Sequence, residues 1–243
     1  MHDKRNGTGR GALRALIATG AAGLLLATPA GAATRSFTIT SFDAIRVEAP
    51  VTVVLTTGAG VSARAEGDQS ALDRLKIDVS GRMLILSMDR ARPGEKSGGA
   101  ATLRLSTGMV DRVIVNGGGS IAIDRMKGLQ GQINLGGNGD ISVATVELDR
   151  LDLTLAGGGR VTLAGRTGVA NVRVIGAGAL AAEPLRARQA SISNEGPGSV
   201  TLTADVNAKI VTAGSGDISV AGKAACTVDN RGTGRVMCGG AGF

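Results

Sequence analysis

The side chains best suited to specific chemistry in this sequence are two cysteines, Cys226 and Cys238, which lie six residues on either side of Gly232. In an exported protein, two cysteines so placed predict a disulfide. A disulfide closing this thirteen-residue loop would add about 3 kcal/mol of stability in the chain-entropy model. Two thiolates without histidine make a poor metal site, and the spacing is not Cys-x-x-Cys. The sequence therefore favours a structural disulfide that closes the C-terminal end of the fold.

Composition excludes several kinds of active site. The 243 residues include one histidine (His2), three phenylalanines and no tryptophan or tyrosine. Because His2 lies in a predicted leader, Ser-His-Asp hydrolysis, histidine-ligated zinc and imidazole acid–base catalysis are excluded for the mature chain. The scarcity of aromatic rings also removes the stacking platforms used by proteins that bind single-stranded nucleic acid. We predict no catalytic residues, no cofactor, no metal site and no nucleic-acid partner.

Three short motifs suggest other activities, but none fits its surroundings. Residues 172–181 contain Gly-x-Gly-x-x-Ala after an apolar run, yet Pro184 follows where the dinucleotide fingerprint requires a helix. Residues 136–141 resemble a calcium-binding nonapeptide, but the aspartate comes one position early and does not recur every nine residues. Asp149 and Asp152 could act on sugars as a carboxylate pair, but strand alternation places them on different faces.

Residues 1–32 have the pattern of a secretory signal peptide. Four basic residues come first, an apolar stretch covers 15–27, and residues 30–32 are Ala-Gly-Ala, a small-residue cleavage site. The apolar stretch is too short to span a membrane, and no other segment approaches a transmembrane span. Cleavage would leave 211 residues with 23 basic and 19 acidic side chains, a net charge of +4. We predict an exported protein with a solvated surface.

A repeat organises the rest of the chain. The pattern Gly-x-Gly-x-(Ile/Val/Leu) occurs seven times, and its second glycines are Gly119, Gly139, Gly159, Gly178, Gly198, Gly216 and Gly234. Successive copies lie 18 to 20 residues apart. Self-similarity at a fixed period of this length is the signature of a repeat architecture.

Apolar residues alternate on both sides of each glycine pair, as in Leu153/Leu155 before one corner and Val161/Leu163 after it. Period-two alternation predicts short strands with one buried face, and glycines allow the sharp corners between them. One coil per repeat predicts an all-β fold, a right-handed parallel β-solenoid with about 18–20 residues per coil. The residues that follow the corners (121, 141, 161, 200 and 218) should then form one vertical file. An antiparallel sandwich is the alternative, but it would not require such constant spacing.

Charged residues after the corners provide a second check on the stacking. Asp140 would lie beside Arg160 in the next coil, and Asp217 beside Arg235. Opposite charges at that separation would contribute about 0.2–1 kcal/mol as cross-strand pairs. We interpret these residues as surface charges that are compatible with in-register stacking of the coils.

The region 33–110 is rich in predicted strands but only weakly periodic. Residues 70–75 suit one helical turn, and 90–99 suit an exposed loop because they contain proline, glycine and charged residues. Solenoids need covered ends. We therefore expect three parts: a signal peptide (1–32), an N-terminal cap with the first coils (33–110), and repeat coils with a C-terminal cap (111–243), the last two forming a single domain. The cap is the expected place for a non-repeating functional surface.

The sequence resembles the auto-transporter adhesin head domain family, also called the head GIN domain family. The resemblance rests on the leader, on Phe-x-x-Ile-x-Val at residues 42–47, and on the series of Gly-x-Gly corners, and it extends over residues 41–240. It implies a β-helical protein of the bacterial envelope, located in the periplasm or at the cell surface. The family provides no catalytic residues to transfer to this chain.

Two classes of function follow. The first is a non-enzymatic, adhesin-like interaction module of the cell envelope, whose partner is an unknown surface ligand such as a glycan or another envelope protein. The alternative is a polysaccharide-binding or polysaccharide-processing β-helix protein. A processing enzyme would need carboxylate and Lys/Arg side chains gathered on one outer face, and the visible charges are scattered along the sequence.

Overall fold

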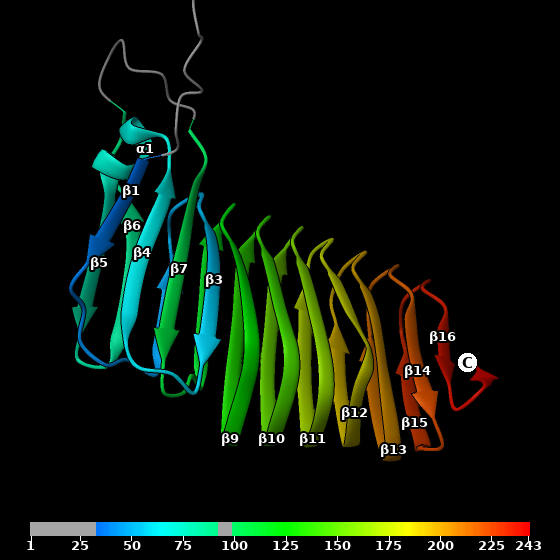
Figure 1. Ribbon diagram of the computed structural model, residues 1–243. Coiled ribbons are helices and arrows are strands. Elements are labelled where there is room, and N and C mark those ends of the chain that lie inside the picture. The colour runs from blue at the N-terminus through cyan, green and yellow to red at the C-terminus, as the bar shows by residue number, and fades with distance from the viewer. Residues whose placement is uncertain (1–32, 92–98) are drawn as a thin grey trace, which may run out of the picture. The chain divides into compact units, whose positions relative to one another are not determined.

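The computed structural model describes residues 33–91 and 99–243 (Figure 1). The predicted signal peptide (1–32) and most of the predicted loop at 90–99 lie outside the described residues. Strands make up 71% of the structure and helix 3%, so the predicted all-β class is confirmed.

The repeat region winds into a parallel β-solenoid. Its long strands are β9 (Ser120–Gly137), β10 (Asp140–Gly157), β11 (Arg160–Ile175), β12 (Ala179–Asn194) and β13 (Ser199–Thr212). Each pairs in parallel with the next, so the predicted stack of parallel coils is confirmed (Figure 1). The stack has about six turns. The last coils contain the shorter strands β14 (Ile218–Gly222), β15 (Ala225–Asn230) and β16 (Val236–Cys238), and β17 (Ala241–Gly242) folds back antiparallel to β16.

One file of apolar side chains runs through these coils. Its members are Val53, Ile121, Ile141, Val161, Leu180, Val200, Ile218 and Val236. Each is at most 2% exposed. From Ile121 onward the register partners are 20, 20, 19, 20, 18 and 18 residues apart. Both the predicted file and the predicted coil length are therefore confirmed.

Strand β10 bends twice between its glycine corners. The buried side chains of β10 are Ile141, Val143, Val146, Leu148, Leu151, Leu153 and Leu155. They follow a two-residue step except at 143–146 and 148–151, where two consecutive side chains point outward. These breaks in the alternation mark bends that divide the coil into three sides. We call residues 144–149 of β10, with their register partners in the other coils, the middle side.

Glycine is required at the corners for two different reasons. Gly157 has a φ of +121°, a conformation that L side chains rarely adopt. Gly159 has an ordinary φ, but a Cβ there would overlap the carbonyl oxygen of Gly139 in the preceding coil. Gly157 thus permits the turn, and both glycines permit the coils to stack closely, because a Cβ on Gly157 would also overlap the carbonyl oxygen of Gly137.

Two polar side chains occupy inward positions near the C-terminal end. Asn194 and Thr212 are fully buried and continue the file that contains Leu155 and Val174 in earlier coils. The Nδ2 group of Asn194 donates a 2.8 Å hydrogen bond to the carbonyl oxygen of Gly198. Within the described residues, Asn194 Oδ1 and the Thr212 hydroxyl have no hydrogen-bond partner. The asparagine therefore stabilises its glycine corner from inside.

Replacing Asn194 by alanine should lower the free energy of unfolding by about 1–3 kcal/mol, because the buried carbonyl of Gly198 would lose its donor. Urea denaturation measures the change. Ser193→Ala, at the neighbouring outward position, is the matched control and should stay near wild type. Equal unfolding midpoints for Asn194→Ala and Ser193→Ala would contradict the assigned role.

The N-terminal region combines coil strands with antiparallel strands. Its elements are β1 (Ala33–Phe37), β2 (Ala44–Val47), β3 (Thr52–Thr57), β4 (Ser62–Gly67), α1 (Gln69–Arg74), β5 (Leu75–Ser80), β6 (Met83–Met88), β7 (Ala101–Thr107) and β8 (Arg112–Gly117). Strands β2 and β3 pair in parallel with β8 and β9, which extends the coils. The pairs β1–β4, β4–β7 and β5–β6 are antiparallel.

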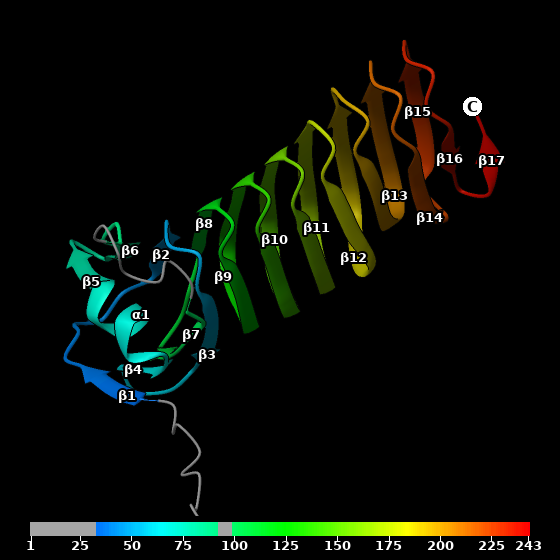
Figure 2. The same cartoon turned by 90° about the horizontal axis from the view of Figure 1, so that it is seen from above.

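The helix α1 forms where one helical turn is expected (70–75), and it lies beside β1 and β4 (Figure 2). Its side chains Ala71 and Leu72 are buried in the same apolar core as the coils. The core is therefore continuous from this helix to Cys238 in the last coil.

Candidate interaction surface

An open groove of about 770 Å³ crosses the middle side of the coils from β9 to β13. Its rim consists of charged side chains, and its floor contains Gly128, Leu148, Thr167 and Gly168. Leu148 and Thr167 are buried, so the outer atoms of the groove belong mainly to the charged residues. The groove therefore presents ionic groups above a small, partly apolar floor.

The charged residues form a column across the coils, and we call it the charge column. It consists of Lys127, Glu147, Arg166, Arg186 and Asp205. Glu147 is the register partner of both Lys127 and Arg166, and Arg166 is the partner of Arg186. Carboxylate oxygens of Glu147 lie 4.0 Å from Lys127 Nζ and 3.6 Å from a guanidinium nitrogen of Arg166. Asp205 pairs with Arg186 at 2.9 Å.

These ion pairs contribute little to folding because they are exposed. The side chains of Lys127 and Arg166 are 72% and 78% exposed, and pairs of this kind are worth about 0–1 kcal/mol. The hydrogen bond from Arg186 to the Asp205 carboxylate raises the pKa of Arg186 above its ordinary value. The charge column therefore contributes little to the free energy of folding, but it keeps its charged groups in a fixed order.

Gly168 lines the groove at its outer bend. It lies between Asp149 in β10 and Arg188 in β12, in consecutive coils. A Cβ on Gly168 would lie 2.6 Å from the carbonyl oxygen of Asp149, so this coil cannot carry a side chain there without a shift. Leu129, at one end of the groove, is 77% exposed. The groove can therefore form ionic, hydrogen-bonding and limited apolar contacts with a ligand.

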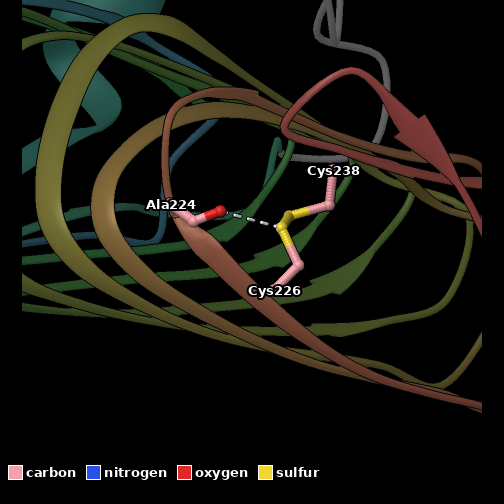
Figure 3. Close-up of a disulfide and its surroundings, with 3 residues drawn as sticks. All are labelled: Ala224, Cys226 and Cys238. Carbon is pink, nitrogen blue, oxygen red and sulfur yellow. Dashed lines mark hydrogen bonds between the residues drawn. A yellow bond between two sulfur atoms is a disulfide. The ribbon is translucent and has the colours of Figure 1, made fainter.

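The two cysteines predicted as a structural disulfide are joined in the structure (Figure 3). Their Cα atoms are 6.2 Å apart, and the bond connects β15 to β16 across the last coil. Cys238 is buried, Cys226 is partly exposed, and the Cys226 sulfur lies 3.3 Å from the carbonyl oxygen of Ala224. The disulfide lies in the coils that follow the last strand of the groove, since β15 pairs with β13, and it fastens the C-terminal coil.

The family model described as "Putative auto-transporter adhesin, head GIN domain" matches residues 41–224 of this sequence. The chain belongs to this family. The resemblance noted from the Gly-x-Gly corners is thereby confirmed. No curated protein matches the sequence.

Several solved structures share the head GIN fold seen here. A putative adhesin from Bacteroides fragilis is 19% identical with a TM-score of 0.76, and the match covers 86% of this chain and 97% of that one. A putative adhesin from Parabacteroides merdae is 18% identical with a TM-score of 0.66, covering 86% and 96%. A putative lipid binding protein from Parabacteroides distasonis is 20% identical with a TM-score of 0.63, covering 85% and 96%. At these identities the likeness concerns the fold.

Sequence reasoning missed the charge column of this head GIN domain, although a signal was present. Its members are 20, 19, 20 and 19 residues apart, the same spacing as the coils. The charge pairs that the sequence did suggest behave differently. Asp140 and Arg160 are register partners, and Asp217 accepts the backbone N–H of Arg235 at 2.9 Å. Neither pair is among the side-chain ion pairs of the described residues.

Two further observations concern the residues at 33–91 and 99–243. No helix in these ranges is long and apolar enough to cross a membrane. Within the same ranges, no group of three or more His, Cys, Asp or Glu side chains is arranged to hold a metal ion.

Proposed function

We propose that this protein is an exported, non-enzymatic interaction module of the bacterial cell envelope. Membership in the adhesin head family supports the general role. The signal-peptide pattern of residues 1–32 supports export to the periplasm or cell surface. The solenoid provides a rigid frame in which side chains repeat from coil to coil.

The observation that carries the proposal is the charge column in its groove. Ionic groups held at fixed coil spacing above an open hollow can recognise a ligand with a complementary charge order. Such complementarity contributes to specificity and to the rate of association. The ligand in this proposal is an envelope or cell-surface component, and the groove binds it without chemical change.

Binding to the bacterial envelope tests the groove. We expect the purified protein to bind envelope preparations of its own bacterium, and the double variant Arg166→Glu/Arg186→Glu to bind at least tenfold more weakly. Arg173→Glu is the control, because Arg173 is an exposed arginine outside the groove that pairs with Glu195 at 2.9 Å. Equal binding by the groove variant and the wild type would contradict the proposal.

Location is tested by brief protease treatment of intact cells. Peptides released from residues 33–243 would support display at the cell surface. Digestion that occurs only after the cell envelope is permeabilised would exclude an adhesin role. The protein would then be assigned as a periplasmic interaction module. Turnover of acidic polysaccharides by the purified protein would overturn the non-enzymatic assignment.

A further inference from the structure

A second hollow, of about 610 Å³, lies on the outer surface of the antiparallel strands of the N-terminal region. It crosses β1, β4, β7 and β3, which are neighbours in that order. Two rows of side chains cross these strands. Ser36, Arg64 and Arg104 are register partners in one row, and Ser62, Ser106 and Thr56 are partners in the other. We call this hollow the two-arginine pocket.

The two arginines face each other directly across β4 and β7. Opposed positions in an antiparallel pair bring Cβ atoms to about 4.5–5.5 Å, and like charges there are unfavourable. Compensation by nearby acids is slight, since Arg104 has Glu66 at 3.8 Å and Arg64 has no ion pair within the described residues. Among the residues that the structure describes, no acidic side chain lines the two-arginine pocket. The pocket thus concentrates positive charge that Glu66 compensates only in part.

Hydroxyl groups surround the two arginines. Ser106 Oγ donates to the carbonyl oxygen of Gly60, and Ser62 Oγ lies 2.7 Å from Ser106 Oγ. Because the Ser106 proton is used on Gly60, Ser62 must be the donor to Ser106. Both lone pairs of the Ser62 oxygen are then free to accept hydrogen bonds from hydroxyl groups of a ligand. Ser36 and Thr56 add two further exposed hydroxyls to the lining.

The size of the pocket favours more than a bare anion. Ligand sites for small molecules typically measure about 300–1,000 Å³. Val61 and Phe37 provide an apolar border, and the guanidinium of Arg35 lies 5.2 Å from the centre of the Phe37 ring. Guanidinium groups bind carboxylates through two parallel hydrogen bonds. A ligand that fits therefore carries a carboxylate, several hydroxyl groups and a compact ring or chain.

We propose that the two-arginine pocket binds a carboxylate-bearing sugar unit of an acidic polysaccharide. Arg64 and Arg104 hold the carboxylate, while Ser36, Ser62 and Thr56 bond the sugar hydroxyls. The inference rests on the proposed interaction function for its biological setting, but it uses a surface separate from the charge column. The pocket proposal also names a chemical class of ligand, whereas the groove proposal does not depend on one.

Calorimetric titration of the purified full-length protein tests this site. The probes are a glucuronate-containing tetrasaccharide, a neutral tetrasaccharide, an acidic peptide of equal charge, and inorganic phosphate. We expect the glucuronate probe to bind at least tenfold more tightly than each of the others. Its affinity should fall as salt is added, because exposed charges are screened.

Arg64→Gln/Arg104→Gln should reduce glucuronate binding at least tenfold. Arg173→Gln, which removes an exposed arginine that lines neither hollow, should leave it unchanged. The double variant should melt no lower than wild type because it removes two opposed like charges. An unchanged affinity in that variant, or equal binding of the neutral sugar or the acidic peptide, would overturn the proposal. Tight binding of phosphate with none of the sugar would identify a simple oxyanion site and overturn it as well.

Failure of this inference is separable from failure of the proposed function. If the glucuronate probe does not bind but envelope binding still depends on Arg166 and Arg186, the two-arginine pocket is wrong and the interaction module stands. If the probe binds through Arg64 and Arg104 while the envelope does not bind, the groove assignment fails and the pocket stands.

Discussion

Leu155→Asp is expected to abolish cooperative folding of the solenoid. Leu155 is fully buried and lies in register between Leu135 and Val174 of the adjacent coils. An aspartate there would place an unpaired charge inside the apolar file, where desolvation costs several kcal/mol. Domains of ordinary stability have only about 5–15 kcal/mol in total. Circular dichroism during thermal and urea denaturation measures the loss.

Thr154→Asp is the matched control for this substitution. Thr154 is the preceding residue on the same strand, points outward, and has Arg173 as its register partner. The same charge at this position should leave unfolding close to wild type. If Leu155→Asp melted like Thr154→Asp, the inward assignment of the file would be wrong.

Removing the disulfide is the second large expected effect. Cys226→Ala/Cys238→Ala should lower the free energy of unfolding by about 3 kcal/mol, because the bond closes a loop with a sequence separation of 12 residues. Urea denaturation of the oxidised wild type and of the variant measures the difference. A reducing agent should bring the wild type to the level of the variant and leave the variant itself unchanged.

The disulfide should also act locally. Hydrogen exchange in β15 and β16 should accelerate in the variant more than exchange in β10, because the bond connects those two terminal strands. Two free thiols in protein recovered from an oxidising compartment would contradict the assignment. Equal stability of variant and wild type would show that the bond is present but dispensable.

The repeat and its core could be predicted from sequence because the positions beside the corners require particular residue types. Ile141 and Val161 must be apolar, and the corner glycines must lack a Cβ, so both recur at the coil spacing. The middle side of the coils is harder to recognise from the sequence. Its inward positions include Gly128 and Thr167 as well as Val146, so alternation of apolar residues is interrupted there.

Other features depend on contacts that no local pattern encodes. Asparagine is usually a surface residue. The buried position of Asn194 depends on its hydrogen bond to the carbonyl oxygen of Gly198, across the glycine corner. Strands β4 and β7 bring Arg64 and Arg104 together although they are 40 residues apart and belong to no repeat. The two-arginine pocket could therefore be found only once the antiparallel register was known.

A crystal structure of residues 33–243 tests the central claim most directly, since the claim is that successive coils stack in register. We predict that Ile121, Ile141 and Val161 lie in one buried row, with neighbouring strands parallel and about 4.8 Å apart. The same row should continue through Val200 and Ile218. Antiparallel neighbours at these positions, or any of these side chains facing solvent, would contradict the stacked solenoid and the two surfaces built on it.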